Sequence, residues 1–553
     1  MRPASRANEL ELSAVALELG ARTVGRLSPA EQALAARGAE RGTPRAARSE
    51  LVRLREAIAR GDDPLGDALC ALRSPVARRP LGATYTPAAI VRAMTAWAAT
   101  NVPARVVDPG AGSGRFVVAA GRRFPRAELV ASEVDPLAAL LLRAHLAAAG
   151  MAERARVVVA DYRSLALPES AGPTLFIGNP PYVRHHAVPA EWKAWLVRRA
   201  GELELSASRL AGLHAHFFLA TAHLARPGDY GAFVTASEWL AVNYGALVRT
   251  LRLERLGAES LHLLDPTLQA FSDAQATAVI SCFRVGSRAP SVRLRRVTSL
   301  DALGDLSSGR PVPRARLEQA SRWTPLTLPA RKAPAGYVEL GELCRVHRGQ
   351  VTGKNGVWIA GPHAADLPRD VLFPAVTKAR ELFAAGAALA DASSLRRVID
   401  LPCELDALSA SARAKVERFL AVARRMGADR GFIARHRRAW WSVGLHEPAP
   451  ILATYMARRP PAFVRNLALV RHINIAHGLY PRGALSAAAL DALARHLASA
   501  TDVTEGRTYA GGLTKFEPRE MERLLVPAPE LLEGAPAALT PARRARTAPA
   551  TPL

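Results

Sequence analysis

The segment 177–182, which reads IGNPPY, carries groups that can activate an amine. The nitrogen of an exocyclic amine shares its lone pair with the ring and is therefore a poor nucleophile. Two hydrogen-bond acceptors at that amine can draw the nitrogen toward tetrahedral geometry. The side-chain oxygen of Asn179 is one acceptor, and the carbonyl of Pro180 is the other, because the Pro180–Pro181 step holds the backbone rigid. The segment indicates chemistry at an –NH2 group, with a plain turn after a strand as the alternative.

Two aromatic side chains could hold a nucleobase at this segment. A base amine cannot be reached inside a duplex, and extruding the base costs a few kcal/mol. Stacking on one aromatic ring returns roughly 1–3 kcal/mol per base, so one ring barely offsets extrusion and two rings would cover it. Tyr182 supplies one flat face, and Phe271, in a loop before an expected strand, is a reasonable second one. On the residues alone, an ordinary buried loop anchor is an equally good interpretation of Phe271.

A glycine-rich turn at 108–116, DPGAGSGRF, lies between an expected strand and an expected helix. Gly110, Gly112 and Gly114 permit positive φ and a close approach of a ligand to the backbone. Such a turn by itself could serve a dinucleotide. Asp108 beside it would repel a pyrophosphate, whereas it favours the cationic amino and sulfonium groups of S-adenosylmethionine. The turn therefore predicts a methyl donor as the cofactor.

Two further acidic residues follow the next two expected strands. Glu133 follows the second strand, where a carboxylate can accept hydrogen bonds from ribose hydroxyls. Asp161 ends the third strand, where it could take the adenine amine of the cofactor, and Tyr162 could pack on that adenine. The alternative for the acidic residues is that they cap helices.

The elements that must position these residues alternate from residue 76 to 290. Short apolar runs separated by helical stretches predict an α/β fold, in which a mostly parallel sheet carries helices on both faces. Ligands of such a sheet lie at the carboxyl ends of its strands. The expected strands are 105–107, 128–131, 156–160, 174–177, 230–235 and 276–283.

The remaining chain divides into four regions. Residues 1–75 alternate Leu and Ala with Arg and Glu at helical spacing, which predicts a helical lead-in: a cap on the next domain, or an arm that binds a partner or DNA. Residues 291–335 are rich in Arg, Pro and Ser with little periodicity, which predicts a linker. A second folded domain is expected at 336–532, and a disordered tail at 533–553.

The composition fits a partner that is a polyanion. The 553 residues carry a formal net charge of +25, although a GC-rich genome would by itself favour Arg and Ala over Lys in this way. Lys and Arg that neutralise phosphates release condensed counterions. The four cysteines lie far apart, which indicates reduced thiols in the cytoplasm and neither a zinc ribbon nor a disulfide framework. No metal site is expected, and no apolar run is long enough to span a membrane.

In their order and spacing, these motifs resemble those of the gamma class of amino-methylating DNA methyltransferases, the TaqI-type enzymes of restriction–modification systems. The segment 82–87, GATYTP, is similar to the first cofactor motif of that class, and the resemblance places Thr86 at the methionine end of the cofactor. The resemblance also makes Phe271 the second stacking aromatic. It implies a Rossmann-like catalytic domain that transfers a methyl group from S-adenosylmethionine to N6 of an extruded adenine in double-stranded DNA. A monomer that acts beside a separate restriction endonuclease is expected.

The resemblance continues into the C-terminal half, which it identifies as an α+β target-recognition domain. The segment 347–355, HRGQVTGKN, is similar to the start of such domains, and 507–516, RTYAGGLTKF, to their closing part. Glycine, hydroxyl and basic residues suit loops that approach phosphates, which makes Arg348, Lys354 and Lys515 the expected DNA contacts. Without the family, both segments are glycine-rich surface turns.

Four other functions are weighed against adenine methylation of DNA. An N4-cytosine methyltransferase would use the same chemistry, although Asn at position 179 favours adenine in this class. An RNA adenine methyltransferase would share the pocket. A protein-glutamine methyltransferase also carries Asn-Pro-Pro-Tyr, but the large basic C-terminal half argues against a protein substrate. A non-catalytic DNA-binding subunit is disfavoured by the intact 108–114 and 179–182 segments.

Overall fold

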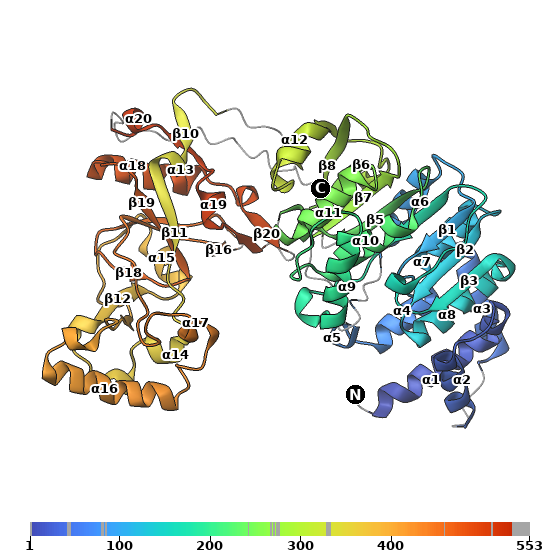
Figure 1. Cartoon of the computed structure of the whole chain (residues 1–553), viewed down its shortest axis with the longest axis horizontal. Coiled ribbons are helices and arrows are strands. Elements are labelled where there is room, and N and C mark those ends of the chain that lie inside the picture. The colour runs from blue at the N-terminus through green and yellow to red at the C-terminus, as the bar shows by residue number, and fades with distance from the viewer. Residues whose placement is uncertain are drawn as a thin grey trace, which may run out of the picture. The chain divides into compact units, whose positions relative to one another are not determined.

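The chain forms two compact units, Met1–Ala330 and Arg331–Leu553, which Figure 1 shows in one view. The computed structural model describes residues 3–40, 46–78, 82, 86–241, 243–265, 268, 271, 277–327, 333–457, 459–509 and 513–533. Apart from Glu533, the tail expected at 533–553 lies outside these ranges.

The first unit is built on a nine-stranded sheet in the order β3-β2-β1-β4-β5-β7-β6-β8-β9. Neighbours from β3 to β5 are parallel, β7 is antiparallel to β5 and β6, and β8 is parallel to β6. The strand order confirms the predicted α/β, Rossmann-like fold, and the chain switches sides between β1 and β4. The strands are β1 (Arg105–Asp108), β2 (Glu128–Glu133), β3 (Ala155–Val159), β4 (Thr174–Gly178), β5 (Tyr230–Ala236), β6 (Ala258–Leu264), β7 (Ala278–Arg284), β8 (Ser291–Val297) and β9 (Arg310–Pro313).

Both faces of this sheet are buried. Neighbouring strand residues point to opposite faces, so Val106 and Ile177 belong to one apolar cluster while Val107 and Phe176 belong to the other. A continuous apolar run is what a parallel strand covered on both faces requires. The helices are α1 (Pro3–Glu18), α2 (Pro29–Glu40), α3 (Arg48–Arg60), α4 (Pro64–Leu72), α5 (Pro75–Arg78), α6 (Ala88–Ala98), α7 (Arg115–Arg123), α8 (Pro136–Ala148), α9 (Ala190–Gly201), α10 (Leu213–Leu224), α11 (Ala246–Glu254) and α12 (Arg314–Gln319).

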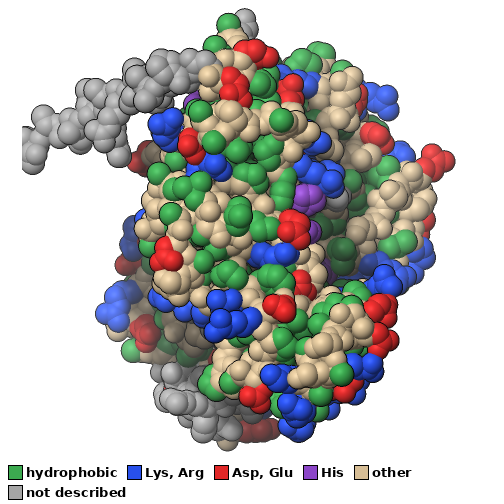
Figure 2. All heavy atoms as spheres, turned by 90° about the vertical axis from the view of Figure 1, so that its left-hand side faces the viewer, with side chains coloured by type: hydrophobic (Ala, Val, Ile, Leu, Met, Phe, Trp, Pro, Cys, Tyr) green, Lys and Arg blue, Asp and Glu red, His purple; other side chains and the backbone are tan. Residues whose placement is uncertain are grey.

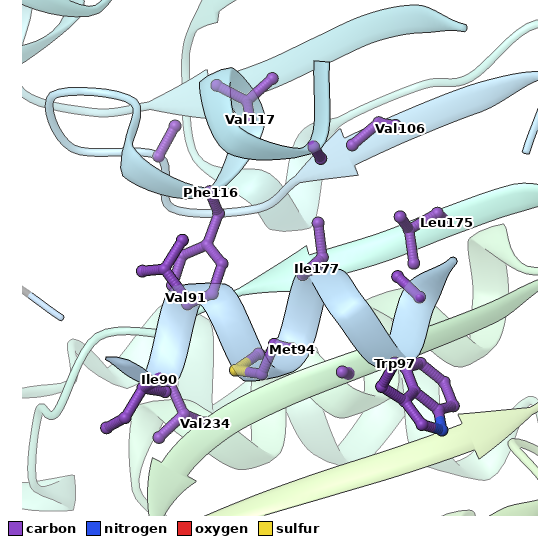
Figure 3. Close-up of a cluster of buried hydrophobic side chains, with 14 of the residues drawn as sticks. Ile90, Val91, Met94, Trp97, Val106, Phe116, Val117, Leu175, Ile177 and Val234 are labelled. Carbon is purple, nitrogen blue, oxygen red and sulfur yellow. The ribbon is translucent and has the colours of Figure 1, made fainter. Parts of the chain in front are cut away.

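Helix α6 follows the segment 82–87 and packs on the sheet. Its apolar residues recur at helical spacing, and Ile90, Met94 and Trp97 lie on the face that meets the strands. Figure 3 shows this row beside Ile177 of β4 and Val234 of β5. Because α6 packs along its length, Thr86, two residues before the helix, is held at a defined place over the sheet.

The N-terminal helices α1 to α4 pack on helix α8. Their apolar residues form one cluster with Leu137, Leu140 and Leu141 of α8. A fully buried ion pair, with 2.7 Å between Arg143 Nε and Glu31 Oε1, ties α8 to α2. The lead-in is therefore an integral part of the first unit.

The predicted linker at 291–335 is wrong for most of its length. Strands β8 and β9 extend the sheet beyond β6, and Trp323 is fully buried in the core that covers it. Along β8, Val292 and Leu294 are buried while Arg293 between them is exposed, as the period of two of a strand requires, and Val297 is buried at the strand's end. The unit boundary instead falls at 330–331.

The second unit is a mixed α+β structure with several small sheets. The largest has the order β11-β19-β15-β17-β13, and the first and last strands of the unit pair as β10-β22, which closes it on itself. Its strands are β10 (Tyr337–Glu339), β11 (Cys344–Arg348), β12 (Leu372–Val376), β13 (Ala388–Leu389), β14 (Arg397–Ile399), β15 (Ile451–Thr454), β16 (Met456–Ala457), β17 (Phe463–Asn466), β18 (Arg471–His472), β19 (Ala476–Pro481), β20 (Arg507–Tyr509), β21 (Leu513–Lys515) and β22 (Leu525–Pro527). Its helices are α13 (Leu340–Leu343), α14 (Asn355–Trp358), α15 (Ala379–Ala385), α16 (Ala410–Arg425), α17 (Phe432–Arg435), α18 (Ala487–Ala500), α19 (Pro518–Met521) and α20 (Pro529–Glu533).

Basic side chains do not gather into one large patch on the face that Figure 2 presents. Lys and Arg are spread there among acidic and apolar side chains. On this face, contacts with a polyanion would therefore depend on particular basic residues more than on a broad field.

Candidate functional site

A cavity of about 370 Å³ lies at the carboxyl ends of the parallel strands. Because the strand order reverses between β1 and β4, the turn after β1 and the segment after β4 face each other there. Eight residues singled out in the sequence lie on its wall: Thr86, Gly110, Gly112, Glu133, Asp161, Tyr162, Asn179 and Pro181.

The turn after β1 presents its backbone to this cavity. Gly112, with a φ of 55°, and Gly114, with a φ of 105°, adopt a left-handed conformation that disfavours a side chain. A Cβ on Gly114 would also lie 2.7 Å from Leu142 Cδ1, so this glycine, which is not on the wall, lets the turn pack against α8. The two glycines thus have different roles: Gly112 forms part of the cavity wall, and Gly114 allows the turn to pack against α8.

Glu133 is anchored to the wall by the backbone around it. Its carboxylate accepts hydrogen bonds from the backbone nitrogens of Gly112 and Val134 at 2.8 Å and of Asp135 at 2.9 Å. Burial raises the pKa of Glu133 even though these hydrogen bonds lower it. Carboxylate oxygens have capacity for further donors, so ribose hydroxyls suit this position.

Asp108 does not line the cavity. Its side chain is 1% exposed, and Oδ2 accepts a hydrogen bond from the backbone nitrogen of Val117 in α7 at 3.2 Å. A Cβ on Gly178 would lie 2.8 Å from Asp108 Oδ1, so the carboxylate also lies against β4. Burial raises the pKa of Asp108 to about 7. The sequence suggested that Asp108 contacts a cationic ligand directly, which would require its side chain to line the cavity. The side chain instead lies behind the turn and holds it through the hydrogen bond to α7.

Asp161 is on the wall, but an adjacent arginine engages it. Arg163 Nε and Nη2 lie 2.7 and 2.6 Å from the two oxygens of Asp161, which is a bidentate ion pair. The Arg163 guanidinium lies 3.6 Å from the ring centroid of Trp192, which also lines the cavity. An adenine amine would share Asp161 with this arginine.

Tyr162 packs inward from the wall. Its ring stacks on Phe217 with centroids 5.2 Å apart, and its hydroxyl lies 2.9 Å from Thr221 Oγ1. Burial raises the pKa of Tyr162 well above its usual range. Tyr162 and Phe217 together form an apolar wall beside Asp161.

The two motifs on either side of the glycine turn meet at Asn179. Its side-chain nitrogen Nδ2 donates to Thr86 Oγ1 at 3.0 Å. The Tyr182 nitrogen donates to the carbonyl of Gly82 at 3.1 Å, and a Cβ on Gly82 would lie 2.7 Å from that nitrogen. Pro180 is buried and off the wall, while Pro181 lies on it.

Tyr182 and Phe271 lie together, as a base clamp requires, but they contact each other. Their ring centroids are 5.8 Å apart in an edge-to-face arrangement, at an angle of 69°. This contact leaves no space for a base between the rings, so a base would have to part them. The Tyr182 hydroxyl has no hydrogen-bond partner within the described ranges, and burial raises its pKa.

Several residues of the cavity wall were not predicted from the sequence. Trp192 follows the catalytic segment by ten positions, and its aromatic type beside Trp195 was the only signal for it. Leu69 and Arg73 come from the N-terminal helices, whose periodicity predicts helix but not what the helix touches. Arg73 pairs with Asp135 and with Glu9, 2.8 Å from its Nε, so the lead-in contributes charged side chains to this site.

In the second unit, two of the three expected DNA contacts come together. Arg348 Cζ lies 5.1 Å, and Lys515 Nζ 5.8 Å, from the ring centroid of Tyr455. Lys515 also pairs with Glu517 at 2.5 Å. Lys354 makes a different contact, in which its Nζ donates to the carbonyl of Met426.

No group of three or more His, Cys, Asp or Glu side chains that could hold a metal ion occurs among the residues that the structure describes. Over the same ranges, no helix combines the length and apolar character needed to cross a membrane.

Known proteins resemble this chain over most of its length. Residues 327–546 match the C-terminal domain of Type II methyltransferase M.Eco57I. The chain is 56% identical over 471 residues, 85% of it and 88% of the relative, to Type II methyltransferase M.XamI of Xanthomonas campestris pv. amaranthicola. It is 22% identical over 468 residues, 81% of it and 85% of the relative, to Type II methyltransferase M.AccI of Acinetobacter calcoaceticus. The solved structure of the Type IIL restriction-modification enzyme MmeI in complex with DNA aligns with a TM-score of 0.49 and 13% identity, over 86% of this chain and 67% of that one. A match of 471 residues is longer than either unit, so the likeness to M.XamI spans both.

Proposed function

The chain belongs to the Type II methyltransferases of restriction–modification systems, and from that membership we propose that it methylates the N6 amine of an adenine in double-stranded DNA, with S-adenosylmethionine as the donor. The observation that carries the proposal is the hydrogen bond between Asn179 and Thr86 at the cavity wall. It joins the amine-activating segment to the motif that, by resemblance, receives the methionine end of the cofactor. The base must leave the duplex to reach this cavity.

The wall fits S-adenosylmethionine by its donors and acceptors. A backbone turn shaped by Gly110 and Gly112, the carboxylate of Glu133 and the acidic-aromatic pair Asp161–Tyr162 suit, in that order, the methionine part, the ribose and the adenine. Asp108 contributes by holding the turn. When bound, S-adenosylmethionine supplies an electrophilic methyl group.

The chain's own part in the reaction is to prepare the target nitrogen. The Asn179 side-chain oxygen accepts a hydrogen bond from the –NH2 group, and the Pro180 carbonyl does so once the entering base reaches this residue, which lies off the cavity wall. The two contacts localise the lone pair of the nitrogen. Thr86 determines the orientation of the amide, since Nδ2 is the end that contacts its hydroxyl. Tyr182 and Phe271 part and stack on the extruded base.

The second unit is proposed to select the DNA sequence. Its match to a Type II methyltransferase C-terminal domain supports this role. Arg348 and Lys515 around Tyr455 form one contact region and Lys354 another. We also propose that the chain acts as a cytoplasmic monomer beside a separate endonuclease; light scattering on the purified protein, alone and with DNA, tests the monomer.

The test is to incubate purified protein with methyl-labelled S-adenosylmethionine and separate samples of duplex DNA, RNA and cell protein. Digestion of the DNA and chromatography of its nucleosides should place the label in N6-methyladenine. Asn179→Ala should bind the cofactor as the wild type does and transfer no label. Label in N4-methylcytosine would contradict the adenine proposal, and label confined to RNA or protein would contradict DNA as the substrate.

A further inference from the structure

One carboxylate of the N-terminal helical region reaches the turn after β1. Asp63 Oδ1 accepts a hydrogen bond from the backbone nitrogen of Gly66 at 2.8 Å and so caps α4. Its other oxygen, Oδ2, lies 2.6 Å from Ser113 Oγ and 2.6 Å from Arg115 Nε. The side chain is only 12% exposed. The cap of α4 uses only Oδ1, so both contacts of Oδ2 are with residues of the turn.

The approach between α4 and the turn is close enough to need a glycine. A Cβ on Gly66 would lie 2.4 Å from Ser113 Oγ, and such a distance is not tolerated. Ser113 is 1% exposed and lines the cavity with its neighbours. The start of α4 therefore lies directly against the backbone turn that would carry the cofactor.

Arg115 connects Asp63 to the segment 179–182 through Thr86. Its Nη1 donates to the carbonyl of Thr86 at 2.9 Å. The hydroxyl of the same Thr86 accepts from Asn179 Nδ2 at 3.0 Å. A continuous series of polar contacts thus runs from Asp63 through Arg115 and Thr86 to Asn179. It joins four segments: the start of α4, the turn after β1, the residues before α6 and the segment after β4.

We propose that Asp63 is a positioning residue for the cofactor turn and, through Arg115 and Thr86, for Asn179. The N-terminal helical region then forms part of the methyl-donor site and is more than a cover for α8. This inference rests on the proposed function, in which the turn binds S-adenosylmethionine. Charge-assisted hydrogen bonds that orient a site residue have large effects on affinity for the group it meets.

Two carboxylates on the same helix allow a matched test. Asp67 Oδ1 also pairs with Arg115, at 2.6 Å from its Nη2, but its side chain is 72% exposed and makes no other contact with the turn that the structure records. In the full-length chain, Asp63→Asn should raise the Kd and KM for S-adenosylmethionine roughly tenfold and lower kcat. The amide has one accepting oxygen and no charge, so it cannot accept from Gly66 on one side and from Ser113 and Arg115 on the other. Asp67→Asn should leave the Kd, the KM and kcat each within about twofold of the wild-type values.

Calorimetric titration with S-adenosylmethionine, steady-state methylation and thermal melting without ligand give the three readouts. A purely structural role for Asp63 would lower the melting temperature and leave the Kd of the folded protein unchanged, which would overturn the proposal. Should Asp63→Asn not fold, Ser113→Ala removes one of the contacts alone and should raise the Kd roughly threefold; an unchanged Kd there would overturn the proposal as well. A wild-type chain that does not bind S-adenosylmethionine would instead contradict the proposed function.

Discussion

Asn179 and Thr86 lie 93 positions apart in the chain and are joined by a hydrogen bond of 3.0 Å. The contact links the segment after β4 to the residues that lead into α6. The contact fixes the orientation of the Asn179 amide, because its nitrogen end is held by the hydroxyl of Thr86, a residue that is only 3% exposed.

Removing that hydroxyl should therefore impair the chemical step more than cofactor binding. In Thr86→Val, which keeps the side-chain shape, we expect kcat to fall roughly tenfold while the KM for S-adenosylmethionine changes little. Thr86→Ser keeps the hydroxyl and should retain most of the activity. A Thr86→Val enzyme with normal kcat in a single-turnover assay would remove the proposed role of this contact.

The Tyr182 hydroxyl should be dispensable, whereas its ring should not. Within the described ranges the hydroxyl is buried without a partner, so Tyr182→Phe should leave methylation within about twofold and the free energy of unfolding unchanged or up to about 1 kcal/mol higher. Tyr182→Ala should abolish turnover. Loss of activity in Tyr182→Phe, measured alongside urea unfolding, would show that the hydroxyl contacts the substrate.

Phe271 should hold the extruded base once the two rings have parted. Phe271→Ala should weaken the fluorescence rise of 2-aminopurine at the target position, because one stacking face worth roughly 1–3 kcal/mol is lost. Phe271→Trp, which keeps an aromatic face, is the control and should preserve the rise. Equal fluorescence in Phe271→Ala and the wild type would exclude Phe271 from the clamp.

The buried carboxyl of Asp108 should make the protein less stable as pH rises. Its pKa is about 7 in the folded state against the usual 3.8, so the folded state retains a proton that the unfolded chain releases. The free energy of unfolding should fall between about pH 4 and pH 7, by up to about 4 kcal/mol in all. His214 and His472 have the opposite effect on stability at acid pH. Burial lowers their pKa values to about 4 and about 3, so the unfolded chain binds protons that the folded state does not, and acid destabilises the fold.

The comparison of wild type with Asp108→Asn isolates this carboxyl, because the histidines are common to both. Urea unfolding without ligand at pH 5.5 and pH 8 should show a smaller loss of stability in the variant. Parallel losses in the two proteins would mean that Asp108 does not titrate in this range.

In the second unit, Arg348 and Lys515 should contribute to DNA affinity through charge. Replacing either with Gln should reduce the slope of log affinity against log salt by about one if it contacts a phosphate. An unchanged slope together with altered site preference would instead indicate a base contact. Lys354→Gln, measured by the same fluorescence-anisotropy titration, tests the separate contact region.

The sequence by itself determined the local chemistry of this protein. Glycines at 112 and 114 are required by their positive φ, a Pro-Pro step constrains its own backbone, and alternating apolar runs predict a doubly wound sheet whose strand ends bring Glu133, Asp161 and Asn179 to one edge. These are properties of short segments and can be read along the chain.

Only the tertiary structure decided which groups face each other. It buried Asp108 behind the turn, added β8 and β9 to the sheet in place of a linker, and brought Asp63 of the N-terminal helices to Ser113. The physical reason is that a side chain's orientation follows from partners contributed by distant elements. No local period or propensity encodes a contact such as that between Asn179 and Thr86, which exists because α6 and β4 share one packed core.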